Sequence, residues 1–362
     1  MALTLIGEGF VVGDDDEKIP TNDLLLDKGL IPVELSAKDG LSLINGTSQM
    51  LRYSILTLQI LNNLLTICDV IYCTSLEAFQ GNAKPADERV HAARPHPGQI
   101  LISARIRQIM QDSEILTGHK DSSKVQDPYS FRCAPQVHGA VYEALTSMRE
   151  TIQIELNSTT DNPLVFPETT DNQSTNISQG NFHGEILALC ADRMSLALFE
   201  LGSISERRMD QLLDSKKSGL PPFLANNSGL ESGMMIVQYS AGSSLAEMHG
   251  PAAPRTAFSN STSEGQEDHV SMGATACWNL YQSCIRLSEV LACELVIACQ
   301  GLEYTTMNPS SFVKSLHKLV RTISPKLTKD RSTSAELQSI AKILREGTWL
   351  SRIEAENERL VR

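Results

Sequence analysis

Two long apolar runs repeat at the spacing of an α-helix, and they constrain the fold more than any other feature of the sequence. Apolar residues fall three and four positions apart from Val270 to Ala298, and a similar run extends from Leu51 to Ile71. No useful length of the chain alternates with the period of a strand. Aromatic residues make up only 5%, which suits helices packed through Leu, Ile, Ala and Met better than sheets. We therefore predict an all-α protein, an elongated bundle of long helices.

Charge and cysteine usage narrow the classes of protein that this chain can belong to. The 31 basic and 43 acidic residues give a net charge of −12, which argues against nucleic acid as a partner. Polar residues such as Arg52 and Asp69 interrupt the run over 51–70, so we predict a buried helix there and no membrane span. The first residues lack the features of a signal peptide. The eight cysteines form no Cys-x-x-Cys pair, so we expect a reducing, cytoplasmic location.

The same periodicity predicts where the remaining helices lie. We expect residues 1–305 to form the central helical bundle with its site loops, and residues 306–362 to form C-terminal helices packed on that bundle. Internal repeats are not evident. The predicted helices cover approximately 49–79, 100–115, 137–156, 185–213, 233–248, 270–298, 310–323 and 334–345.

The stretch from Gln126 to Gly139 holds the densest group of chemically capable side chains. Two prolines within it favour a structured loop that leads into a helix. Tyr129 and Arg132 are three residues apart, so one helical turn would place both on one side. A guanidinium can grip a carboxylate in bidentate fashion and a phenol can relay a proton, which together suit an amino-acid substrate. The alternative is a surface turn with a satisfied ion pair.

His96, which lies between two prolines, is a weaker candidate for a ligand. No second histidine or carboxylate stands beside it at the spacing of a metal site. We therefore expect a structural role for His96 and no metal in this protein.

The order Gln-Asp-x-Tyr-Ser-x-Arg-Cys-x-Pro-Gln-Val-x-Gly over 126–139 resembles the signature loop of the histidine ammonia-lyases, within the aromatic amino-acid ammonia-lyase family. This resemblance implies a fumarase/aspartase-like helical architecture and a homotetramer whose sites combine residues of three subunits. Local departures are Ser48 after the Asn-Gly-Thr stretch and Gln179 in place of a glycine. The further stretches that resemble the family, in the same order, include 43–47, 157–163, 178–184, 205–208 and 266–272.

The resemblance also implies a reaction and a role for each matching residue. The family eliminates ammonia from an aromatic amino acid with an electrophile, methylidene-imidazolone (MIO), that cyclises from an Ala-Ser-Gly triplet; neither a metal nor a nucleotide is needed. The implied roles are proton transfer by Tyr129, carboxylate binding by Arg132, hydrogen bonds around the amine and the electrophile from Asn45 and Gln126, packing against the electrophile by Phe182, and a position near the substrate ring or amine for Glu267.

Glu267 bears on the choice of substrate. A carboxylate can accept the N–H of an imidazole or stabilise its cation, whereas the similar phenylalanine and tyrosine lyases carry glutamine at this place. The resemblance therefore favours histidine as substrate and urocanate as product, with a phenylalanine or tyrosine ammonia-lyase or aminomutase as the alternative. Read from the sequence alone, Glu267 could also be an acid that complements a helix N-terminus.

The Ala-Ser-Gly triplet does not occur in the 362 residues. The chain therefore resembles the C-terminal two-thirds of the family, and we expect it to form no urocanate by itself. A truncated sequence, a two-chain enzyme with a separate N-terminal fragment, and a degenerate relative acting as a non-catalytic helical scaffold all remain open.

Overall fold

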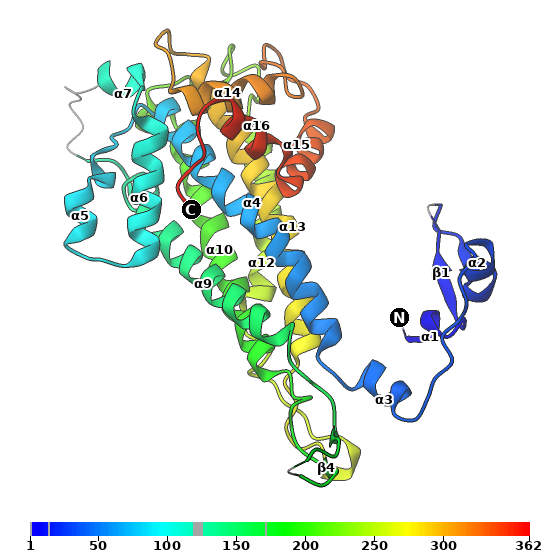
Figure 1. Cartoon of the computed structure of the whole chain (residues 1–362). Coiled ribbons are helices and arrows are strands. Elements are labelled where there is room, and N and C mark those ends of the chain that lie inside the picture. The colour runs from blue at the N-terminus through cyan, green and yellow to red at the C-terminus, as the bar shows by residue number, and fades with distance from the viewer. Residues whose placement is uncertain (1, 14, 119–125, 171) are drawn as a thin grey trace.

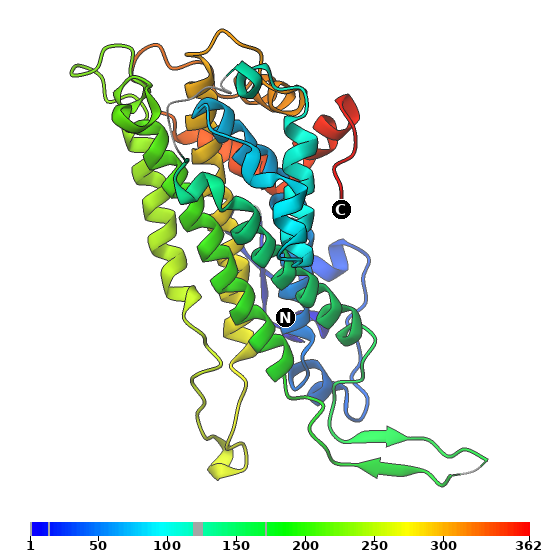
Figure 2. The same cartoon turned by 90° about the vertical axis from the view of Figure 1, so that its left-hand side faces the viewer.

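The computed structural model describes residues 2–13, 15–118, 126–170 and 172–362. Its long helices lie side by side along one axis and form an elongated bundle (Figures 1 and 2), which confirms the predicted all-α class. Two of these helices both begin and end within one residue of the prediction. The long helices of the bundle are α4 (Ser48–Ala78), α9 (Ala134–Glu155), α10 (Glu185–Leu213), α12 (Met235–Ala252) and α13 (Gly273–Leu302).

Helices α4 and α13 form the centre of the bundle. In one half of each helix, apolar residues occur on every side. Every residue over 64–78 of α4 and over 290–302 of α13 is buried, as expected for helices covered on all sides. Most of the cysteines lie on these two helices and act as small apolar side chains. Burial raises the pKa of the Cys284, Cys293 and Cys299 thiols to about 12, so they stay protonated at neutral pH.

Within the described residues, one stretch, Asp39–Ala78, has the length and apolar composition that could cross a membrane. Its apolar part is α4, whose second half is packed inside the bundle against α9, α10 and α13. The sequence-based prediction of a buried helix at this place is confirmed.

Successive long helices run in opposite directions, so the loops between them gather at the two ends of the bundle. We call these the α4-start end and the α4-finish end. The loops before α4, α10 and α13 lie at the α4-start end, with the hairpin of β3 (Leu164–Phe166) and β4 (Thr175–Ile177) (Figure 1). The 31 residues of α4 span roughly 46 Å at 1.5 Å per residue, which separates the two ends.

Several elements differ from the predicted ones. The prediction of two closing helices was incomplete, because a third follows a left-handed glycine, Gly347 with φ 74°. Two short antiparallel hairpins were also missed, because three-residue strands are too short to establish an alternating pattern. The remaining elements are α1 (Ala2–Leu5), β1 (Phe10–Val12), β2 (Lys18–Pro20), α2 (Thr21–Asp27), α3 (Asp39–Ile44), α5 (Glu88–Ala92), α6 (Pro97–Met110), α7 (Glu114–Gly118), α8 (Tyr129–Arg132), α11 (Ser215–Ser218), α14 (Ser311–Arg321), α15 (Ser334–Glu346) and α16 (Thr348–Glu356), with 3-10 turns at Lys84–Ala86, Pro222–Leu224 and Ser263–Gly265.

The two ends of the chain are placed differently. Helices α14, α15 and α16 pack against α4, and α14 and α15 also contact α13; a boundary near residue 305 stays a prediction. The N-terminal segment, in contrast, extends away from the bundle (Figure 1). Its β1–β2 hairpin and α2 pack on each other and leave large apolar side chains exposed.

Candidate active site

Tyr129 and Arg132 form the short helix α8 at the α4-finish end, as the spacing predicted. The Arg132 guanidinium carbon lies 4.5 Å from the centre of the Tyr129 ring, a distance typical of a cation–π contact. Tyr129 is 71% exposed, and Arg132 is half-buried. The turn therefore presents a phenol and a guanidinium on the same side.

The two residues between them anchor this turn in the core. The ring of Phe131 is fully buried and stacks on Phe79 with 4.4 Å between the ring centres. The Tyr72 hydroxyl donates to the Phe131 carbonyl at 2.9 Å. Because both Phe131 and the following helix are anchored, the side chains of Tyr129 and Arg132 are directed outward by a rigid backbone.

Beside this turn lie two buried polar atoms that have no partner in the described structure. They are Nε of Arg132 and Oε1 of Gln136, four residues further on. An unpaired buried polar atom costs free energy, so a group that supplied an acceptor to Arg132 would bind favourably here. Gln136 was missed as a candidate, although its i, i+4 spacing from Arg132 was a usable signal.

A buried ion pair in the bundle core contacts the backbone of this turn. Arg208 on α10 contacts Glu294 on α13 through both Nε and Nη2, the latter at 2.8 Å, and both side chains are fully buried. Burial alone would lower the pKa of Arg208, but the Glu294 carboxylate raises it, so Arg208 keeps its positive charge. Arg208 also donates to the Ser130 carbonyl at 3.4 Å and thereby connects α8 to the bundle core.

The other predicted site residues lie at the α4-start end. Asn45 is half-buried between α3 and α4, and Phe182 is half-buried just before α10. Glu267 is exposed in the loop before α13, where one carboxylate oxygen accepts a hydrogen bond from Thr262 at 2.7 Å. A hydrogen bond between the His183 ring and the His269 carbonyl connects the last two loops. The structure therefore brings Phe182 and Glu267 to neighbouring loops.

Gln126 lies with the first group and is exposed. The adjacent Asp127 faces inward, where its carboxylate accepts the backbone N–H of Asn82 at 2.7 Å. The predicted residues thus form two groups: Gln126, Tyr129 and Arg132 at one end, and Asn45, Phe182 and Glu267 at the other. Since α4 separates these ends, one chain by itself does not bring the guanidinium, phenol and carboxylate into a common cavity.

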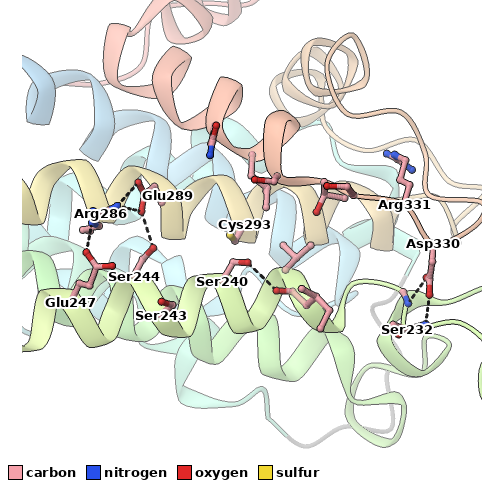
Figure 3. A pocket seen from close by; sticks show the side chains of 18 residues that line it. Ser232, Ser240, Ser243, Ser244, Glu247, Arg286, Glu289, Cys293, Asp330 and Arg331 are labelled. Carbon is pink, nitrogen blue, oxygen red and sulfur yellow. Dashed lines mark hydrogen bonds and ion pairs between the residues drawn. The ribbon is translucent and has the colours of Figure 1, made fainter. Parts of the chain in front are cut away.

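A groove of about 750 Å³ between α12, α13 and α15 contains none of these residues (Figure 3). The Arg286 guanidinium within it lies 2.7 Å from Glu247 and 2.8 Å from Glu289. Ser244 also donates to Glu289. Because its nearest carboxylates already neutralise this arginine, the groove is poorly suited to the carboxylate of an amino acid.

One group of side chains in the described part of the chain has the composition of a metal site. A ligand atom from each of His183, Glu185 and His269 lies within 4.8 Å of the others. His96, the histidine singled out in the sequence, is exposed at the start of α6 and is not in the group. The sequence did not indicate this group because 86 residues separate the two histidines along the chain.

Comparisons with known proteins identify relatives along almost the whole chain. A family described as "Aromatic amino acid lyase" matches residues 1–322. The histidine ammonia-lyase of Sorangium cellulosum is 41% identical over 357 residues, which are 98% of this chain and 69% of that protein. The histidine ammonia-lyase of Myxococcus xanthus is 40% identical, and the match covers 98% of this chain and 69% of that protein. The chain thus spans about two thirds of these relatives.

Solved structures agree with these sequence comparisons. The crystal structure of histidine ammonia-lyase from Trypanosoma cruzi matches with a TM-score of 0.88 at 34% identity and covers 98% of this chain and 67% of that one. A tyrosine aminomutase from Streptomyces globisporus matches with a TM-score of 0.91 at 32% identity. This match covers 100% of this chain and 72% of that one.

Proposed function

Since the chain belongs to the aromatic amino acid lyase family, we propose that it forms the helical core of an enzyme that eliminates ammonia from L-histidine to give urocanate. The observation that carries this proposal is the arrangement of Arg132. Its Nε atom is buried and has no partner among the described residues, and its guanidinium lies against Tyr129 on a turn anchored in the core. This is a prepared position for the carboxylate of an amino acid.

Each side chain then has a defined task. Arg132 binds the substrate carboxylate and fixes its orientation, and Gln126 and Asn45 supply hydrogen bonds around the amine. Tyr129 is exposed enough to reach a substrate proton and assists its transfer. Glu267 faces the imidazole and accepts its N–H, which favours histidine over phenylalanine or tyrosine.

In this family the MIO group supplies the electrophile that activates the substrate for loss of ammonia. Its Ala-Ser-Gly precursor is not among the 362 residues, so we propose that an MIO-bearing segment completes the site. Phe182 is the side chain of this chain suited to lie against that group, since it is a half-buried aromatic residue on a loop at the α4-start end. Arg132 and Tyr129 bind and orient the substrate from the opposite side.

The two groups of site residues can meet when copies of the chain pack side by side in opposite directions. We therefore propose a homotetramer in the cytoplasm, in which the α4-start end of one copy faces the α4-finish end of another. The exposed apolar side chains of the N-terminal segment support this assembly, because large exposed apolar patches mark interfaces.

Two alternatives remain, and each has a supporting observation. The similarity to a tyrosine aminomutase supports an aromatic substrate other than histidine. The absence of the precursor triplet supports a non-catalytic helical scaffold. Glu267 and the intact set of substrate-contacting residues favour the histidine lyase over both.

The test measures urocanate by its absorbance. The purified chain is incubated with L-histidine, L-tyrosine or L-phenylalanine, alone and after co-expression with the MIO-bearing N-terminal segment of the Sorangium relative. We expect product from histidine only in the complemented sample, and a loss of at least tenfold for Arg132→Ala. Glu267→Gln should lower the preference for histidine.

Urocanate formation by the chain alone would contradict the need for completion. Product from tyrosine or phenylalanine in preference to histidine would overturn the substrate assignment. A folded, complemented assembly that converts none of the three would favour the scaffold.

A further inference from the structure

We propose that His183, Glu185 and His269 form a binding site for a divalent transition-metal ion of the Zn²⁺ type. The three ligand atoms lie within 4.8 Å of one another. None of these residues has a role in the reaction proposed above. The inference therefore rests on the cluster itself and does not depend on the lyase activity.

The donor set selects the kind of ion. Two imidazole nitrogens and one carboxylate oxygen suit zinc and similar ions, whereas Mg²⁺ and Ca²⁺ prefer oxygen ligands alone. Bonds from Zn²⁺ to these atoms are about 2.0–2.2 Å, so side-chain shifts of roughly 1 Å bring all three into contact with one ion. Three protein ligands leave a fourth position for water.

A hydrogen bond prepares His183 for this task. Its Nε2 donates to the His269 carbonyl at 3.1 Å, which assigns the ring proton to Nε2 and leaves Nδ1 with a lone pair. Histidines that bind metals usually donate their second N–H to a backbone carbonyl or carboxylate in this way. The rings of His183 and His269 are also stacked, 5.7 Å apart with 9° between their planes, so the two loops hold the imidazoles next to each other.

The backbone holds the ligands in place before an ion arrives. His183 and Glu185 flank Gly184 at the start of α10, and His269 precedes α13. An added Cβ on Gly184 would lie 2.3 Å from the Met50 sulfur, and one on Gly273 would lie 2.5 Å from it. Both loops are therefore in close contact with Met50 of α4. The helices that follow these loops, α10 and α13, pack along each other.

An ion at this site would connect the loops that carry Phe182 and Glu267. It would also stabilise the folded chain, because a ligand that binds only the native state raises the unfolding temperature.

The experiment titrates the tag-free, full-length chain, freed of metal with a chelator, with Zn²⁺ in a calorimeter. We expect one ion per chain to saturate at micromolar concentrations, with a rise in the melting temperature and no comparable effect of Mg²⁺. His183→Gln, Glu185→Gln and His269→Gln should each weaken binding at least tenfold. His96→Gln is the matched control, since it removes an exposed imidazole outside the cluster, and it should leave binding unchanged.

Circular dichroism of the metal-free variants establishes which of them fold. Only the folded variants are compared with the unaltered chain. Equal Zn²⁺ affinity in the folded cluster variants and the unaltered chain would overturn the proposal. The absence of saturation by roughly 100 µM Zn²⁺, or equal binding of Mg²⁺, would overturn it as well. Because binding is measured without substrate, failure here leaves the lyase proposal untouched, and failure of the lyase assay leaves this one untouched.

Discussion

Single side chains carry both the chemistry and some of the pH dependence of this protein. The spacing of Tyr129 and Arg132 was enough to predict that they share one side of a turn, and the contact of 4.5 Å confirms it. Spacing alone did not predict that the Arg132 Nε atom is buried and lacks a partner in the part of the chain that the structure describes. That property depends on Phe131 and Phe79, which come together from segments 52 residues apart and anchor the turn.

Glu77 is a residue whose ionisation should affect stability near neutral pH. Its carboxylate accepts the Ser310 N–H at 2.8 Å at the start of α14, and burial raises its pKa from 4.5 to about 7. The folded chain therefore holds a proton that the unfolded chain releases above pH 4.5. The stability contributed by this proton is complete below pH 4.5 and is lost as the pH rises to about 7.

Glu77→Gln keeps the acceptor for Ser310 but has no charge to bury. As the pH rises from 5 to 8, we expect the unfolding free energy of the variant to increase by roughly 1–3 kcal/mol relative to that of the unaltered chain. Urea denaturation at both pH values measures this gain. Glu356→Gln, at an exposed position, serves as control, and an unchanged difference between pH 5 and pH 8 would contradict the prediction.

At the scale of elements, periodicity predicted the long helices well because each buries a wide apolar face. Helix α10 occupies the predicted residues 185–213, and α4 lies within one residue of its predicted bounds. Short elements were harder to predict. Helix α16 has only nine residues after a left-handed glycine, and its place depends on burying Trp349 and Ile353 against the bundle.

The Arg208–Glu294 pair connects α10, α13 and the α8 turn, and its loss should affect all three. Glu294→Gln leaves a buried guanidinium without its counter-charge, so we expect a loss of about 3–5 kcal/mol in unfolding free energy. Replacing both partners by Arg208→Met and Glu294→Leu should cost less, since neither charge is then buried.

Urea denaturation of the single and double variants forms the test. A double variant less stable than Glu294→Gln would contradict the argument. The ion pair of Arg89 and Asp87 at the surface offers a control, in which the same kind of change should cost far less unfolding free energy, because solvent screens both charges.

At the scale of the whole molecule, the separation of the two ends and the exposed N-terminal segment are the dominant features. Predicted site residues lie at both ends of a bundle roughly 46 Å long, so an assembly of copies is needed to complete any site that uses them all. The N-terminal segment exposes Phe10, Leu26 and Ile31, the last to 89%. A chain of this kind should not stay monomeric at working concentrations.

Ile31→Asp should weaken the assembly because it places a charge in a surface that we expect another copy to cover. The sedimentation coefficient at micromolar concentration should fall from that of an oligomer towards that of a monomer. Lys28→Glu, in the same segment and also exposed, changes charge without removing apolar surface and should leave the coefficient unchanged. A monomeric unaltered chain, or equal sedimentation of Ile31→Asp, would contradict this prediction.

The sequence by itself determined the helical class, the course of the long helices and the pairing of Tyr129 with Arg132. These follow from interactions between residues close in the chain, which a period of 3.6 and a spacing of three residues record directly. Only the tertiary structure decided that Glu267 lies at the opposite end from Arg132, and that His183 and His269 meet. Such neighbours are brought together by the packing of long helices against one another, and the spacing of residues along the chain carries no trace of it.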